Sequence, residues 1–157
     1  MSKPLEASEE FVWKTNPAGL QLGDCGELFS LEARLPEGAR LVPLAGIIPD
    51  KLEHGTMGAE NFQIVDMQSK QVLTKLLTRL ERIGLSIHHV YRVTVYLVGT
   101  KEMISTFNDA WKEVFKVAGV ELMPTRALVL VKGLVSDDFF VEIVPDAFRS
   151  PKIDIIP

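Results

Sequence analysis

The middle of the chain alternates between helical and strand patterns, and this alternation restricts the possible folds more than any other feature of the sequence. Residues 63–83 carry one apolar stripe at helical spacing, with Asn61 placed to cap the helix and Gly84 placed to end it. Residues 90–98 are rich in β-branched side chains and predict a strand. A second helical stripe covers residues 103–118. The pattern therefore predicts helix, strand and helix in succession.

Short apolar runs on both sides of this central part predict the remaining strands. Residues 28–33 and 41–46 flank the turn-forming sequence 35–38, which predicts a hairpin. Two more strands are expected near 126–134 and 139–148, joined by a short polar loop as a second hairpin. The expected order is β-β-α-β-α-β-β, which defines an α+β domain.

The strand expected at 126–134 is apolar on both sides, which indicates that both of its faces are covered. Its alternating residues are Ala127, Val129 and Val131 on one side and Leu128, Leu130 and Leu134 on the other. Two helices can cover only one face of the expected sheet. We therefore expect the chain to form an oligomer that covers the second face.

Length and composition are those of one globular domain. The chain has 157 residues, of which 46% are apolar and 24% are charged, so it is long enough to bury a core. We expect an N-terminal extension at residues 1–25, the folded domain at 26–149 and a tail at 150–157. Phe11 and Trp13 are candidate anchors for the extension.

Charge, cysteine content and hydropathy exclude several classes of function. The net charge is −4 and no basic cluster reaches five residues, which argues against nucleic acid as the main partner. Cys25 is the only cysteine, so neither an intrachain disulfide nor a cysteine-based metal site is available. No apolar run approaches the roughly 18–20 residues of a membrane span, and the first residues do not read as a signal peptide. We expect a cytoplasmic protein, with an organellar address left open.

Two charges stand in otherwise apolar strands and are the main candidates for a functional site. Arg126 opens one strand and Glu142 lies inside the next. Burying an ion without a partner costs on the order of several kcal/mol, so each charge needs a reason. A guanidinium and a carboxylate between apolar walls would bind a small organic acid and move a proton. The alternatives are a solvated or paired strand-end charge for Arg126 and an interface ion pair for Glu142.

The expected hairpin also predicts which copies of the chain supply the two charges. It places Arg126 opposite about Ala147, so that Glu142 lies five positions along the strand, on the order of 17 Å away at 3.4 Å per residue. That separation is too large for one small ligand. We therefore predict a composite site, with Arg126 from one subunit and Glu142 from the next.

Several segments, in the right order and spacing, resemble the YjgF/RidA-like reactive-intermediate (enamine/imine) deaminases, a family also described as endoribonucleases or translation inhibitors. The segments are residues 45–49, 68–73, 83–85, 91–97, 107–111, 124–126 and 141–143. The resemblance runs from about Phe29 to about Ala147.

The resemblance implies a chorismate-mutase-like fold and a homotrimeric barrel with its helices outside and ligand clefts between subunits. It implies hydrolysis of reactive 2-enamino and 2-imino acids to 2-keto acids and ammonia, without a metal or an organic cofactor. Arg126 would bind the substrate carboxylate and Glu142 would be catalytic. Asn108 would donate or accept a hydrogen bond in the pocket, where Gly46 also lies. The neighbouring Phe107 and Trp111 are expected to be core residues.

Other positions depart from the family pattern and make the pocket more apolar. Phe29 stands where a tyrosine is usual, Ala45 where a serine is usual, and Leu128 where a small thiol or hydroxyl residue is usual. Lys75 replaces an asparagine common in the first helix. These changes keep a second hypothesis open, a non-catalytic member that binds small carboxylates or acts as a chaperone or regulatory module. Ribonuclease activity is less favoured because the chain is acidic.

Overall fold

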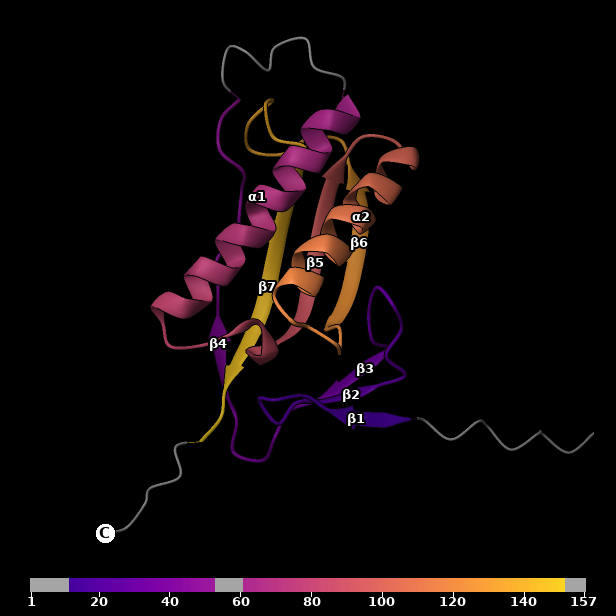
Figure 1. The fold of residues 1–157 in the computed structure, drawn as a ribbon. Helices are drawn as coiled ribbons and strands as arrows, with labels where there is room; N and C mark the ends of the chain where they lie inside the picture. Colours follow the sequence, from indigo (N-terminus) through magenta and orange to yellow (C-terminus); the bar gives the residue numbers. More distant parts are fainter. Residues whose placement is uncertain (1–11, 53–60, 152–157) are drawn as a thin grey trace, which may run out of the picture.

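The computed structural model describes residues 12–52 and 61–151 (Figure 1). In chain order the elements are β1 (Trp13–Thr15), β2 (Gln21–Gly23), β3 (Glu32–Arg34), β4 (Arg40–Pro43), α1 (Asn61–Arg82), the short 3-10 helix η2 (Ile87–His89), β5 (Val90–Val98), α2 (Glu102–Val117), β6 (Thr125–Val131) and β7 (Val141–Arg149). The helix, strand and helix expected in the middle of the chain are thus confirmed.

A four-stranded sheet with the order β4-β7-β5-β6 forms the main layer of the fold. Strands β5 and β6 run parallel, because α2 connects them as a crossover, whereas β7 pairs antiparallel with both β5 and β4. Both long helices cover the same face of this sheet (Figure 1). The main core lies between the helices and that face.

The two helices contribute one buried stripe each, as their apolar spacing predicts. The buried apolar residues of α1 are Ile64, Val65, Val72, Leu73, Leu76 and Leu80, and those of α2 are Phe107, Ala110, Trp111 and Phe115. Gly84 follows α1 with a φ of 73°, a left-handed conformation that glycine adopts at little cost. Within the described residues, neither helix is both long and apolar enough to cross a membrane.

A smaller antiparallel sheet, β1-β2-β3, lies at one end of the main sheet (Figure 1). The first hairpin expected from the sequence is therefore wrong, because β3 pairs with β2 while β4 pairs with β7. Turn residues reverse the chain direction without deciding which strands pair. Leu20 and Leu22 are fully buried against Phe148, and this second small core holds β2 beside β3. Of the two proposed anchors of the N-terminal extension, Trp13 lies in β1, whereas Phe11 lies outside the described residues.

The second expected hairpin is also wrong, because β5 lies between β6 and β7. The parallel β5-α2-β6 unit occupies one edge of β5, which leaves only the other edge to β7. Arg126 was expected to lie opposite Ala147 of β7, but it lies opposite Val93 of β5. Val93 in turn lies opposite Pro145 of β7. The distance inferred from the hairpin register does not apply.

The face of the main sheet away from the helices carries a mixture of apolar and charged side chains. Tyr96, Glu142 and Val144 are half-buried there, and Val129 is 44% exposed. No helix among the described residues covers this face (Figure 1). The oligomer expected from the apolar pattern of 126–134 stays a prediction.

Candidate functional site: a half-buried arginine among aromatic rings

Arg126 lies on β6 with its side chain on the helix-covered side of the sheet. Neighbouring residues of a ladder point to the same face, and the partner of Arg126 is the fully buried Val93. The guanidinium carbon lies 5.0 Å from the ring centre of Trp111, 5.6 Å from that of Phe29 and 5.8 Å from that of Phe107. All three distances are within the range of a cation–π interaction. Aromatic rings therefore form the walls around this cation.

The guanidinium of Arg126 keeps one hydrogen-bonding position open. Its Nη1 is buried and has no hydrogen-bond partner among the described residues. Burial lowers the pKa of Arg126, yet an arginine starts so far above neutrality that the side chain stays charged. A buried donor without a partner is costly, and a bound anion would satisfy it.

Asn108 carries an unsatisfied acceptor on the helix that also supplies Phe107 and Trp111. It follows Phe107 on α2 and precedes Trp111 by three positions, so it lies on the same flank of the helix. Its Oδ1 is buried and has no hydrogen-bond partner among the described residues. Among the described residues, both buried side-chain atoms without a hydrogen-bond partner thus belong to predicted pocket residues.

Phe29 and Leu128 lie on the same side of the sheet as Arg126. Phe29 is 37% exposed and forms an outer wall of the site through its contact with the guanidinium. Leu128, two residues after Arg126, lies opposite Val95 and packs against the main core. Both residues add apolar surface where the family pattern predicts hydroxyl or thiol groups.

Glu142, Gly46 and Ala45 form a second group, away from Arg126. Glu142 lies opposite Tyr96 on the face without helices. Gly46 lies directly against its carboxylate, because a Cβ atom at position 46 would collide with Oε1. A bridge between Ile47 and Ile143, with N–H to carbonyl distances of 2.7 Å and 3.1 Å, holds the two segments together.

Ala45 marks the outer end of this second group. The residue is exposed, and its carbonyl accepts a hydrogen bond of 3.0 Å from Nη1 of Arg79 on α1. The structure therefore places Arg126 and Leu128 on one face of the sheet, and Glu142 with Gly46 against it on the other.

The separation of the two groups follows from the ladder. Glu142 lies two strands away from Arg126 and three residues further along the strand direction. Standard spacings make this about 10 Å across the sheet and about 10 Å along the strands. The odd offset of three also puts the two side chains on opposite faces. One chain does not bring them together, and the composite site stays a prediction.

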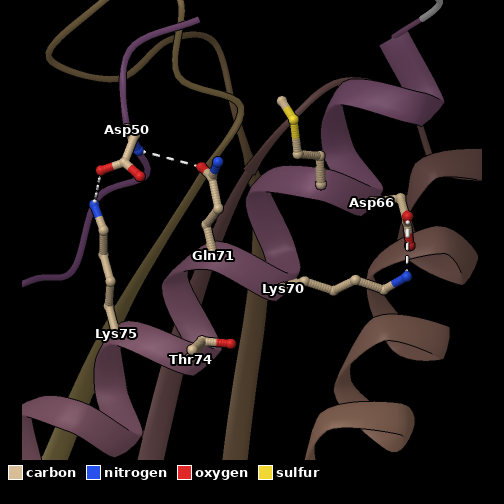
Figure 2. A pocket seen from close by; sticks show the side chains of 7 residues that line it. Asp50, Asp66, Lys70, Gln71, Thr74 and Lys75 are labelled. Carbon is tan, nitrogen blue, oxygen red and sulfur yellow. Dashed lines mark hydrogen bonds and ion pairs between the residues drawn. The ribbon is translucent and has the colours of Figure 1, made fainter.

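A groove on the outer side of α1 was not expected from the sequence (Figure 2). It has a volume of about 540 Å³ and is lined by Asp50, Asp66, Met67, Lys70, Gln71, Thr74 and Lys75. Its charges pair with one another, since Lys75 contacts Asp50 at 2.6 Å and Lys70 contacts Asp66 at 3.2 Å. Lys75 also donates to the carbonyl of Ile48 at 3.0 Å. The interactions of Lys75 with Asp50 and Ile48 therefore connect α1 to the loop that precedes it.

The contact between Trp111 and Arg126 was not predicted from the sequence. The burial of Trp111 as a core residue is confirmed, but its ring also borders Arg126. The apolar stripe gives no sign of this second role. Across the described segments, no cluster of three or more His, Cys, Asp or Glu side chains is arranged to hold a metal ion.

The fold and the half-buried cation define a small α+β protein with an arginine between aromatic rings on the edge strand of its sheet. The family profile described as Endoribonuclease L-PSP matches residues 37–148, more than half of the chain. The protein therefore belongs to this family, which is the YjgF family expected from the resemblance. A search of curated protein sequences finds no match.

Solved structures confirm the YjgF-like α+β fold. TdcF of E. coli, solved with bound serine, is 27% identical and has a TM-score of 0.58 over 74% of this chain and 85% of its own. The E. coli YjgF gene product is 24% identical, with a TM-score of 0.58 and the same coverage of 74% and 85%. YyfB of Yersinia pestis, a Rid family protein, is 18% identical, with a TM-score of 0.60 over 77% and 86%.

Proposed function

We propose that the protein hydrolyses reactive 2-enamino and 2-imino acids to 2-keto acids and ammonia in clefts between the subunits of a homotrimer. The observation that carries the proposal is the half-buried Arg126, whose Nη1 has no hydrogen-bond partner among the described residues. A guanidinium binds a carboxylate through a planar pair of N–H donors, and the aromatic rings around this one leave it half-buried. Arg126 therefore supplies the carboxylate anchor.

Asn108 extends the anchor to the nitrogen of the substrate. Its unsatisfied Oδ1 is an acceptor, which suits a ligand that carries an N–H group close to its carboxylate. The 2-keto acid product has an oxygen in place of that nitrogen and offers no hydrogen. The amide oxygen of Asn108 therefore suits the N–H of the imino acid.

The reaction itself needs little beyond orientation and proton transfer. Water adds to the carbon of the C=N bond, the resulting carbinolamine loses ammonia, and one water is consumed for each ammonia released. A carboxylate near that carbon would take a proton from the attacking water and return it to the leaving nitrogen. Glu142 of a neighbouring subunit is the group we assign to this step, since Glu142 of the same chain lies on the other face of the sheet.

The ligand of a relative agrees with this substrate class. TdcF, 27% identical to this chain, was solved with bound serine, a small acid with an amino group beside its carboxylate. The proposed substrates share that arrangement of carboxylate and nitrogen. We therefore expect small, short-chain substrates that fit between Phe29 and Leu128.

One experiment tests the proposal directly. A pyridoxal-phosphate dehydratase generates 2-aminoacrylate, and pyruvate release is followed with the wild type, Arg126→Ala and Arg126→Lys. We expect acceleration by the wild type, loss of most of it in Arg126→Ala, and partial retention in Arg126→Lys, which keeps the charge without the fork. An Arg126→Ala variant as fast as the wild type contradicts the proposal.

The apolar walls favour a second function, a non-catalytic module that binds small carboxylates. Phe29, Ala45 and Leu128 supply no hydroxyl or thiol group, so proton transfer depends on Glu142 alone. Carboxylate binding that requires Arg126, without any acceleration of imine hydrolysis, would support this function. Ribonuclease activity is less favoured, because the net charge is −4 and one half-buried arginine does not make a basic groove.

A further inference from the structure

Trp111 joins three parts of the proposed site. Its side chain is fully buried on α2 and packs edge-on against Phe115, with ring centres 4.5 Å apart. The ring also lies 5.0 Å from the guanidinium carbon of Arg126. At the same time the indole N–H donates to the carbonyl of Leu28 at 2.8 Å. Trp111 therefore contacts both the arginine and the chain segment around Leu28.

That segment, residues 25–30, carries Phe29 and is called the strap below. It is fixed on both sides of Phe29. On one side Leu28 accepts the indole hydrogen bond. On the other side Ser30 donates its hydroxyl to the carbonyl of Met123 at 2.6 Å and its N–H to the carbonyl of Pro124 at 3.1 Å. The exposed ring of Phe29 therefore has a fixed place although it lies at the surface.

We propose that Trp111 is a positioning residue, which holds the guanidinium of Arg126 with its ring and the Phe29 wall of the carboxylate site with its indole N–H. This inference rests on the proposed function, because it assumes that Arg126 binds the carboxylate. Trp111 does not touch the ligand. It fixes the orientation of the guanidinium and the position of the strap relative to α2, so that the site is formed before the ligand binds.

A purely structural role for Trp111 is the alternative, and matched variants separate the two. Trp111→Phe keeps an aromatic ring but removes the N–H that holds Leu28. Phe115→Leu damages the same aromatic cluster on the same helix, and among the described residues the rings that surround the guanidinium of Arg126 are those of Phe29, Phe107 and Trp111. Both variants are expected to lower the unfolding midpoint. Only Trp111→Phe is expected to change the site.

The probe is pyruvate, the smallest product of the proposed reaction. We measure its dissociation constant by calorimetry for the full-length wild type, Trp111→Phe, Phe115→Leu and Arg126→Ala. We expect about fivefold to tenfold weaker binding in Trp111→Phe, from one lost hydrogen bond and a loosened cation–π contact. With 2-aminoacrylate, KM is expected to rise by a similar factor while kcat changes little.

A fluorescence measurement adds a readout that folding alone does not move. The chain has two tryptophans, so Trp13→Phe leaves Trp111 as the only one. Pyruvate bound to Arg126 neutralises a charge 5.0 Å from the indole centre, and the emission is expected to shift on saturation. The same titration in a Trp13→Phe, Arg126→Ala protein is expected to show no shift.

The outcomes distinguish this inference from the proposed function. If pyruvate binding depends on Arg126 but Trp111→Phe binds as tightly as the wild type, the positioning role is wrong and the proposed function stands. Equal weakening in Trp111→Phe and Phe115→Leu, at equal loss of stability, also overturns it. If the wild type neither binds pyruvate nor accelerates hydrolysis, both fall together.

Discussion

Arg126 and Glu142 lie on opposite faces of the same four-stranded sheet, with β5 between their strands. Arg126 points to the side of the helices, where aromatic rings surround it. Glu142 points to the side that no described helix covers, against Gly46. If both residues serve one ligand, a second copy of the chain must supply one of them. In that case the proposed reaction would depend on the assembly of subunits.

Complementation between inactive variants tests this link. Arg126→Ala and Glu142→Gln are each expected to lose most imine hydrolysis. After the two proteins are unfolded together and refolded at equal amounts, mixed oligomers contain some sites with both native residues. Random mixing gives about one quarter of the sites of a symmetric oligomer, and a similar share of wild-type activity.

The separately refolded variants serve as controls for this experiment and are expected to stay inactive. A mixture that remains as inactive as its components, although mass spectrometry shows mixed oligomers, would mean that each site takes both residues from one chain or does not use Glu142. Full activity of Glu142→Gln alone would remove its proposed catalytic role.

Gly46→Ala is expected to displace the carboxylate of Glu142. An added Cβ would collide with Oε1, and the bridge between Ile47 and Ile143 prevents the backbone from moving away. We expect at least a tenfold loss of kcat, because a displaced proton-transfer group costs one to several powers of ten. Gly133→Ala is the matched control, since a Cβ there meets nothing within 4 Å. Equal activity of both variants would contradict the assigned role of Gly46.

The two helices and the long strands of the fold could be predicted from the sequence, whereas the pairing of its strands could not. The expected strand 90–98 coincides with β5, and both helices begin and end within two residues of their expected bounds. Local periodicity defines such elements. Strand pairing depends on contacts between residues that are far apart in the sequence. One example is Leu22 of β2, which is buried against Phe148 of β7 and so helps to hold β2 where β3 pairs with it. The short β1 and β2 carry too few residues for any period.

The candidate site shows the same division between local and distant information. Arg126 stands out in the sequence because a charge interrupts an apolar strand. The role proposed for Trp111 is hidden, since its spacing is that of an ordinary core residue on α2. The contact between Gly46 and Glu142 requires the bridge at Ile47, which joins segments far apart in the chain. Such contacts appear only once the strands are paired.

Arg126→Met is expected to stabilise the fold while it abolishes carboxylate binding. Burial opposes the charged form of Arg126, and its Nη1 has no partner among the described residues. A methionine of similar length keeps the apolar contacts, so the free energy of unfolding is expected to rise by up to about 1 kcal/mol. Urea unfolding at fixed protein concentration measures the change.

The matched control for this variant is Arg92→Met on the neighbouring strand. Arg92 is exposed and contacts Asp146 at 2.9 Å, so its removal is expected to change stability by less than about 1 kcal/mol and not to raise it. A clear loss of stability in Arg126→Met would show that the stacking of the guanidinium on the aromatic rings outweighs the cost of its burial.

Stability is expected to fall as the pH drops from 7 toward 5, because of the histidines of η2. Burial lowers the pKa of His88 and of His89 below the ordinary value of 6.5, and the positive charges of His88 and Arg149 lower that of His89 further. The unfolded chain then binds more protons than the folded one below pH 6.5. The free energy of unfolding therefore rises with pH in this window, by less than about 1.4 kcal/mol per pH unit for each histidine.

His89→Asn tests the contribution of His89. The Nδ1 of His89 accepts a hydrogen bond of 3.1 Å from the backbone N–H of Ser86, which requires an unprotonated nitrogen. The Oδ1 of asparagine offers an acceptor in a similar place and does not titrate. Urea unfolding at pH 5, 6 and 7 is expected to show a shallower pH dependence than in the wild type, with stability at pH 7 little changed. An unchanged slope in His89→Asn, with a flatter one in His88→Asn, would assign the effect to His88 instead.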